Sequence, residues 1–214
     1  SEQLQPIINL YTQGQLQQAL SCAKQALERF PDSLVLYNLA GAANAGLMQF
    51  DAAIESFKQA LRIKPNYADA YYNIGIALNG KGDLEAAIDS YKQALKFKPN
   101  YAGAYYNMGN ALNDKGDLEA AIDSYNEALK IKPDYADAYY NMGNALKDKG
   151  DLDSAINCYQ QALKINPDYA EAYNNMGSIL QSRGDLEAAI DSFKQALTFK
   201  TDYAEALSNM GNAL

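Results

Sequence analysis

An asparagine returns at the same point of a 34-residue period through most of this 214-residue chain. The copies, which we call the asparagine ladder, are Asn73, Asn107, Asn141, Asn175 and Asn209. A carboxamide offers donor and acceptor positions, so it can pair with a guest peptide's backbone whatever its sequence. Asparagine is a mediocre helix former, so helix propensity does not explain its return. Peptide binding is one explanation, and the alternatives are a hydrogen bond to a neighbouring helix or copying by repeat duplication.

Further polar side chains fall close to the same helix face as the asparagine ladder. Tyrosine supplies contact area with a polar tip, and packing against an adjacent helix is its alternative role. An asparagine three residues after a ladder position falls almost one helical turn further along that face. These accompanying residues complete the candidate peptide-binding site: Tyr72, Tyr106, Tyr140, Asn110 and Asn144.

Acidic residues gather around the asparagine ladder, with Lys147 as the exception. They are Asp69, Asp114, Asp137, Asp148 and Glu171. A negatively charged surface favours a cationic guest. We therefore expect the partner to be a protein or peptide segment in extended conformation, basic or polar in composition.

Catalytic chemistry has little support in the residues of this chain. It contains no histidine, which removes histidine-based triads and histidine metal ligands. No glycine-rich phosphate loop is present, and the carboxylates mostly fall at helix starts and on solvated helix faces. We therefore expect no enzymatic activity and no metal or other cofactor.

The charge balance bears on the class of partner. With 26 acidic and 18 basic residues, the formal net charge is -8. Sequence-independent binding to nucleic acid, like binding to an anionic membrane surface, needs an excess of lysine and arginine, so we expect neither partner. Cys22 and Cys158 lie four periods apart, and we expect no disulfide across four stacked repeats. Two free thiols favour a reducing, cytoplasmic location.

The segments that position these residues are predicted to be pairs of short helices. Apolar residues recur at three- and four-residue spacing over about 68–81 and again from about residue 84. Gly82 is placed to end the first helix, and Asp83 to cap the second with its carboxylate. Pro99 prevents the second helix from continuing. Polar residues after the prolines are expected to cap the helices that come next: Asn100, Asp134 and Asp168.

The 34-residue period predicts one elongated solenoid domain, 1–214, in place of a single globular core. The first repeat is divergent, which favours a capping role. Met48 stands where later repeats have glycine, and Thr201 replaces a proline. The repeats span residues 1–33, 34–67, 68–101, 102–135, 136–169 and 170–203, followed by a half repeat, 204–214.

Each repeat carries a fixed set of aromatic and small residues. The first helix has an aromatic residue near its start, at Tyr37, Tyr71, Tyr105, Tyr139 and Tyr173, and a small residue later, at Gly75, Gly109, Gly143 and Gly177. The second helix has an alanine at Ala53, Ala87, Ala121, Ala155 and Ala189, and an aromatic residue at Phe57, Tyr91, Tyr125, Tyr159 and Phe193. Proline closes the repeats at Pro31, Pro65, Pro99, Pro133 and Pro167. This pattern resembles the tetratricopeptide repeat over nearly the whole chain.

The resemblance implies an all-α, right-handed superhelix of antiparallel helix pairs, A and B, with the A helices lining the concave face. Family members bind peptides or partner proteins there, so we expect a protein–protein interaction scaffold. The asparagine ladder is similar to the one in O-linked N-acetylglucosamine transferases, which implies an alternative: the non-catalytic, substrate-recognition arm of a larger enzyme. A structural solenoid that self-assembles end to end is a third reading, because fold alone does not choose among functions.

Overall fold

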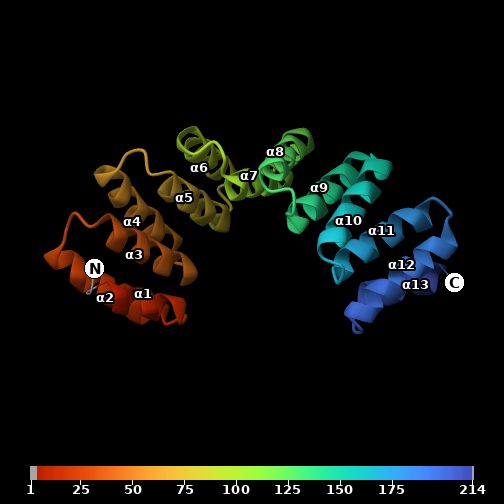
Figure 1. Cartoon of the computed structure of the whole chain (residues 1–214), viewed down its shortest axis with the longest axis horizontal. Helices are drawn as coiled ribbons and strands as arrows, with labels where there is room; N and C mark the ends of the chain where they lie inside the picture. The colour runs from red at the N-terminus through yellow and green to blue at the C-terminus, as the bar shows by residue number, and fades with distance from the viewer. Residues whose placement is uncertain (1–3, 214) are drawn as a thin grey trace. The chain divides into compact units, whose positions relative to one another are not determined.

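The computed structural model describes residues 4–213, and these residues form helices without any strand, which confirms the all-α class. They make two compact halves, an N-terminal half that ends at Lys115 and a C-terminal half that begins at Gly116. The N-terminal half contains α1 (Gln5–Thr12), α2 (Leu16–Arg29), α3 (Leu34–Gly46), α4 (Phe50–Ile63), α5 (Ala68–Lys81), α6 (Leu84–Phe97) and α7 (Ala102–Asp114). The C-terminal half contains α8 (Leu118–Ile131), α9 (Ala136–Lys149), α10 (Leu152–Ile165), α11 (Ala170–Ser182), α12 (Leu186–Phe199) and α13 (Ala204–Ala213) (Figure 1).

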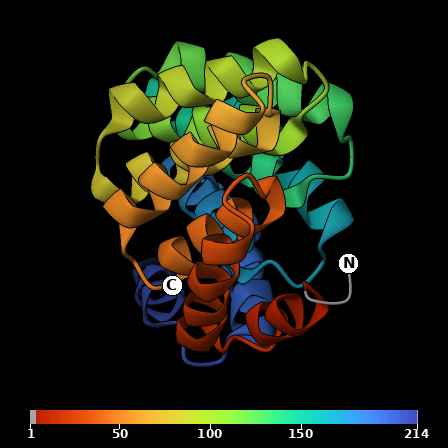
Figure 2. The same cartoon turned by 90° about the vertical axis from the view of Figure 1, so that its left-hand side faces the viewer.

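Odd-numbered helices are the A helices of the repeats and even-numbered helices are the B helices. Within each half, every helix packs against the next one along the chain, as α4 does on α5 and α10 on α11. Figure 2 turns the N-terminal helices, coloured red to yellow, toward the viewer and shows this succession. Each repeat therefore buries its apolar face against its neighbours, as in a solenoid. No helix in residues 4–213 combines the length and the apolar character that crossing a membrane requires.

An aromatic ring of the B helix lies directly on a glycine of the A helix. A Cβ atom placed on Gly143 would lie 2.7 Å from Cε1 of Tyr159, whose side chain is fully buried. The same contact occurs in three further repeats, between Gly41 and Phe57, Gly75 and Tyr91, and Gly177 and Phe193. Glycine is required here because only a residue without a side chain lets the two helices approach so closely. The B-helix alanines are equally buried at Ala53, Ala87, Ala121, Ala155 and Ala189.

Aspartates begin three of the B helices, as the sequence predicts. Asp83, Asp117 and Asp151 are the N-caps of α6, α8 and α10, and each carboxylate accepts a hydrogen bond from a backbone N–H three residues later. Hydrogen bonding from Ser154 lowers the pKa of Asp151, because the bond favours the ionised carboxylate. These caps satisfy N–H groups that the helix itself leaves without partners.

The predicted caps of the A helices were wrong. Tyrosines hold the N-cap positions of α7, α9 and α11, and none of them makes a side-chain cap bond: Tyr101, Tyr135 and Tyr169. Each A helix begins one residue later than the cap prediction assumed. Asn100, Asp134 and Asp168 are therefore exposed residues between helices, and Tyr101 and Tyr169 pack on Tyr72 and Tyr140 of the same repeat.

Met48 has a left-handed backbone conformation. Its φ is 59°, whereas the glycines at the same phase of later repeats, Gly82, Gly116, Gly150 and Gly184, have φ between 81° and 91°. A Cβ atom makes this conformation unfavourable by about 1–2 kcal/mol, because it crowds the following carbonyl oxygen. The second repeat therefore carries backbone strain that later repeats avoid.

Replacing Met48 by glycine is expected to raise the free energy of unfolding by about 1 kcal/mol, because relief of strain exceeds the entropy that glycine adds to the unfolded chain. Met48 is 75% exposed, so little packing is lost with its side chain. Urea denaturation measures the change. Gly82→Met is the matched reverse variant and should destabilise by a similar amount. An unchanged midpoint for Met48→Gly would show that this turn relaxes without cost.

Candidate peptide-binding surface

The ten residues of the candidate site all lie on A helices, and all are half-buried. In the N-terminal half, α5 and α7 carry Tyr72, Asn73, Tyr106, Asn107 and Asn110. In the C-terminal half, α9, α11 and α13 carry Tyr140, Asn141, Asn144, Asn175 and Asn209. We call these sets the N-terminal and C-terminal A-surfaces.

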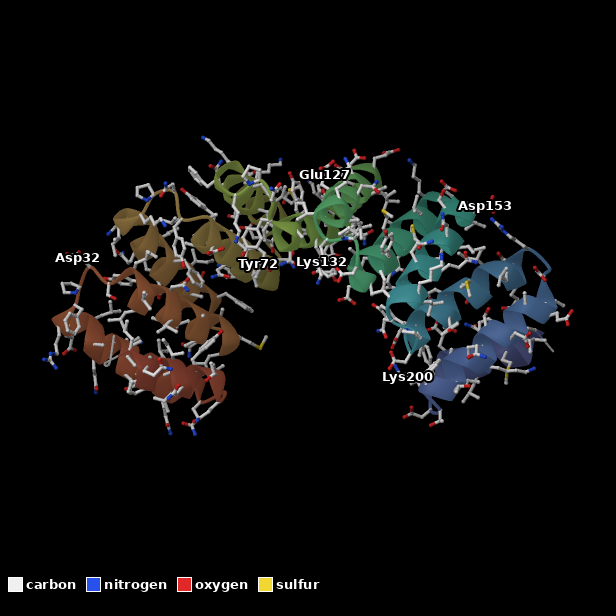
Figure 3. The ribbon with its side chains drawn as sticks, viewed as in Figure 1. Asp32, Tyr72, Glu127, Lys132, Asp153 and Lys200 are labelled. Carbon is white, nitrogen blue, oxygen red and sulfur yellow. The ribbon has the colours of Figure 1, made fainter. Side chains whose placement is uncertain are left out.

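Tyr72, labelled in Figure 3, connects α5 and α7 in the N-terminal A-surface. Its hydroxyl accepts a hydrogen bond of 3.0 Å from Nδ2 of Asn107, one repeat later. Its ring centroid lies 4.7 Å from that of Tyr101. Burial raises the pKa of Tyr72, so its hydroxyl remains protonated at neutral pH. Asn73, in contrast, makes no side-chain hydrogen bond with the described residues, and its amide keeps its full hydrogen-bonding capacity.

Asn175 is the centre of a hydrogen-bond network on the C-terminal A-surface. Nδ2 of Asn175 donates to the hydroxyl of Tyr140 at 3.2 Å and to Oδ1 of Asn144 at 2.9 Å. The same Oδ1 accepts a bond of 2.8 Å from the hydroxyl of Tyr159, the ring that lies on Gly143. Asn144 and Asn175 are thus tied to the packed interior of the repeat.

Sequence reasoning missed one member of this network, Asn174. Its side chain is fully buried, and its amide donates to Oε1 of Glu205 at 3.1 Å. Its Oδ1 accepts a bond of 3.1 Å from Asn209, which also donates to Oγ of Ser178 at 3.3 Å. A signal was present, because three earlier repeats have tyrosine at the phase of Asn174. The smaller amide accepts a bond from the next A helix, as the hydroxyls of Tyr72 and Tyr140 do.

The structure contains the hydrogen bonds that the alternative explanation of the asparagine ladder requires. Asn107, Asn175 and Asn209 each bond an A helix of the preceding repeat. This does not remove a binding role, because a carboxamide has two donor and two acceptor positions. Asn175 uses both donors and accepts a bond of 3.5 Å from Asn174, whereas Asn107 uses one donor. Asn107 therefore keeps more hydrogen-bonding capacity for a guest than Asn175 does.

Packing, the alternative role of the tyrosines, is observed in both halves. Tyr140 lies 4.7 Å from Tyr169 and 5.9 Å from Tyr159 between ring centroids, and Tyr72 makes the corresponding contacts in its own half. The hydroxyl of Tyr169 donates to Oδ1 of Asp137 at 3.2 Å. The rings of Tyr72 and Tyr140 therefore pack within their own repeats, while their hydroxyl groups accept hydrogen bonds from the next A helix.

Carboxylates near the A-surfaces are partly neutralised within the protein. Asp69 pairs with Lys98 at 3.3 Å, and Glu171 pairs with Lys200, labelled in Figure 3, at 3.1 Å. The ammonium of Lys98 also lies 3.9 Å from the ring centroid of Tyr101, within reach of a cation–π interaction. The surfaces are therefore less acidic than their composition indicates, and amide and hydroxyl groups supply most of the chemistry that a guest meets.

The titratable groups favour hydrogen bonding over acid–base chemistry. Burial raises the pKa of Tyr101, and it raises that of Tyr203 to about 12. The thiol of Cys158 is buried, and its pKa is raised to about 11. All three groups are therefore protonated at neutral pH. Within residues 4–213, no three histidine, cysteine or carboxylate side chains lie close enough together to hold a metal ion.

Family models match the chain along nearly its whole length. A model described as TPR repeat matches residues 49–82, 77–114, 109–150, 143–182 and 177–214. A second model, described as tetratricopeptide repeat, matches residues 7–46. The chain belongs to the tetratricopeptide repeat family. No curated protein matches the sequence.

Solved tetratricopeptide structures are similar to this one. A crystal structure of MamA is 30% identical, with a TM-score of 0.72, and the match covers 77% of this chain and 96% of MamA. YrrB, described as a TPR protein with an unusual peptide-binding site, is 21% identical, with a TM-score of 0.73 and coverage of 90% and 98%. PilF of Pseudomonas aeruginosa is 16% identical, with a TM-score of 0.83 and coverage of 99% and 96%. The likeness to YrrB and PilF shows the fold alone.

Proposed function

We propose that this tetratricopeptide array is a protein–protein interaction scaffold that holds an extended peptide or partner segment along its A helices. The observation that carries the proposal is the row of half-buried amides on the A-surfaces, held in place by bonds between neighbouring A helices. Family membership and the peptide-binding site named for YrrB support it. A basic or polar guest fits best, because the surfaces present amides, hydroxyls and several carboxylates. No observation on the described residues favours the enzyme-arm or end-to-end reading over the scaffold.

Spacing supports recognition of a peptide backbone. Packed helices lie about 8–10 Å apart, and an extended peptide advances about 3.3 Å per residue. Each ladder asparagine would thus meet the guest at about every third residue. Such contacts are hydrogen bonds to backbone groups of the guest, which every sequence offers, so we expect broad specificity and modest affinity. Contacts of the guest with Tyr72, Tyr106 and Tyr140 would adjust that affinity.

Changing Asn73 and Asn107 together to alanine is expected to weaken guest binding roughly tenfold. Each side chain that hydrogen-bonds the guest contributes about 0.5–1.5 kcal/mol to the binding free energy. Asn73 and Asn107 are chosen because their amides keep hydrogen-bonding positions that the protein itself does not use. Helicity should persist, because alanine is the better helix former. Calorimetric titration with a segment of a partner recovered by pull-down measures the affinity, and circular dichroism follows the fold.

Two further variants control this experiment. Asn157→Ala removes an exposed asparagine from α10, a B helix, and should leave the affinity unchanged. Asn175→Ala breaks two hydrogen bonds within the protein, so it is expected to lower stability more than the Asn73 and Asn107 pair does. If the double variant binds as the unmodified chain does, the asparagine ladder is a structural feature only.

A further inference from the structure

A groove of about 700 Å³ lies between α8 and α9 of the C-terminal half. Two of its lining residues, Leu129 and Met142, are apolar and only 8% exposed, and Tyr139 lines it as a half-buried aromatic. The other lining residues are polar side chains of α8: Asp123, Asn126, Glu127 and Lys130. The volume falls within the usual range for ligand-binding clefts. Because none of the ten candidate-site residues lines it, this groove is distinct from the A-surfaces.

The repeat supplies an internal comparison for every residue of this groove. One period earlier, on α6 and α7, five of the seven residue types are the same: Asp89, Leu95, Lys96, Tyr105 and Met108. The other two differ, because Asn126 stands in place of Lys92, and Glu127 in place of Gln93. Both differences make the α8–α9 groove more negative. Helix packing does not require them, since α12 also carries lysine and glutamine at this phase, Lys194 and Gln195.

The loss of one lysine leaves an aspartate uncompensated. Lys92 pairs with Asp89 at 3.9 Å on α6, and Lys194 pairs with Asp191 at 3.5 Å on α12. On α8 the corresponding position is Asn126, and Asp123 forms no ion pair with the described residues. Glu127, labelled on α8 in Figure 3, pairs with Lys130, so the only lysine that lines the groove is already engaged.

We propose that the α8–α9 groove binds a cationic peptide segment. A guanidinium or ammonium group of the guest would pair with Asp123, and an apolar neighbour would cover Leu129 and Met142. The charge complementarity is local, because the corresponding residues on α6 and α7 include two lysines and one carboxylate. A charge-assisted hydrogen bond beside a partly desolvated apolar floor is stronger than one in open water. Exposed charges are screened by salt, so binding should weaken as ionic strength rises.

Reverting the two divergent positions tests the proposal. The probe is a fluorescein-labelled hexapeptide of alternating arginine and leucine, titrated into the whole chain and followed by fluorescence anisotropy. The double variant Asn126→Lys and Glu127→Gln is expected to bind it at least tenfold more weakly. Its fold should persist, because α6 and α12 already carry these residue types at the same phase. Asp123→Asn should weaken binding in the same direction.

The reciprocal change provides a gain-of-function variant. Lys92→Asn with Gln93→Glu gives the positions on α6 and α7 the same seven residue types as the α8–α9 groove. The expected result is a second groove of this kind, so that the variant binds one more peptide per chain than the unmodified protein does. A hexapeptide with glutamate in place of arginine should bind none of these chains.

Three outcomes would overturn the proposal: no binding of the arginine probe by the unmodified chain, equal affinity of the unmodified and reverted chains, or equal binding of the arginine and glutamate peptides. The Asn73 and Asn107 double alanine variant should bind the probe as the unmodified chain does. Loss of probe binding in that variant would place the probe on the N-terminal A-surface and would likewise overturn the α8–α9 site.

Discussion

Replacing Gly143 by alanine is expected to lower the free energy of unfolding by about 2 kcal/mol. The new Cβ would lie 2.7 Å from Cε1 and 2.9 Å from Cδ1 of Tyr159, both far inside van der Waals contact. The ring cannot move aside cheaply, because it is fully buried and its hydroxyl is bonded to Asn144. Overpacking of this kind costs about 1–3 kcal/mol and outweighs the helix propensity that alanine gains over glycine.

Gly211 is the matched control for the Gly143 variant. It has the same repeat phase, on α13, but a Cβ placed on it meets no atom of the described residues within 4 Å. Gly211→Ala is therefore expected to stabilise the helix by up to about 1 kcal/mol. Thermal unfolding should show a melting temperature that is lower by roughly 4–8 °C for Gly143→Ala and not lower for Gly211→Ala. Equal effects of the two variants on the melting temperature would mean that the contact between Gly143 and the Tyr159 ring does not restrict the residue at position 143.

Replacing Asn44 by leucine is expected to raise the free energy of unfolding by about 2 kcal/mol. Asn44 is only 2% exposed, and its Oδ1 has no hydrogen-bond partner among residues 4–213. Its Nδ2 lies 3.5 Å from Oγ of Ser56, which already donates to the carbonyl of Ala52. A buried polar atom without a partner costs about 1–3 kcal/mol. Leucine has the same branching as asparagine, so it can fill the site and add apolar burial.

The repeat indicates that leucine fits this position. Leucine stands at the same phase in later repeats, at Leu78, Leu112, Leu146 and Leu180. The reverse change, Leu78→Asn, introduces the same defect in the next repeat and should destabilise by at least as much. Guanidinium denaturation of both variants measures the two changes. A destabilised Asn44→Leu chain would mean that the amide makes a contribution that its hydrogen bonds do not reveal.

The helices were predictable because their signals are local. The sequence predicted a helix over about 68–81, and α5 spans Ala68–Lys81. A glycine ends a helix through the φ angle of its own backbone. An aspartate begins a helix by accepting a hydrogen bond from a backbone N–H only three residues away. The failed cap prediction at Asn100 marks the limit of such reasoning, because a shift of one residue in the turn moved the N-cap to Tyr101.

The candidate site was predictable as a set of positions but not as a set of bonds. Periodicity placed the asparagines on one face of the A helices, and all ten predicted residues do lie on A helices. Their hydrogen bonds depend on neighbouring repeats. Asn107 donates to Tyr72, 35 residues away, and the buried Asn174 bonds Glu205, 31 residues away.

The sequence by itself determined the repeat, the helix pairs and the family, because these follow from residue type and spacing within one period. Only the tertiary structure decided which amides of the asparagine ladder retain hydrogen-bonding capacity and which carboxylates lack a counter-charge. Asn73 differs from Asn175 through side chains that approach only after the helices have packed, and Asp69 gains its counter-charge from Lys98, 29 residues away, in the same way. The physical reason is the short range of hydrogen bonds and contact ion pairs, which makes them depend on distances that repeat stacking sets.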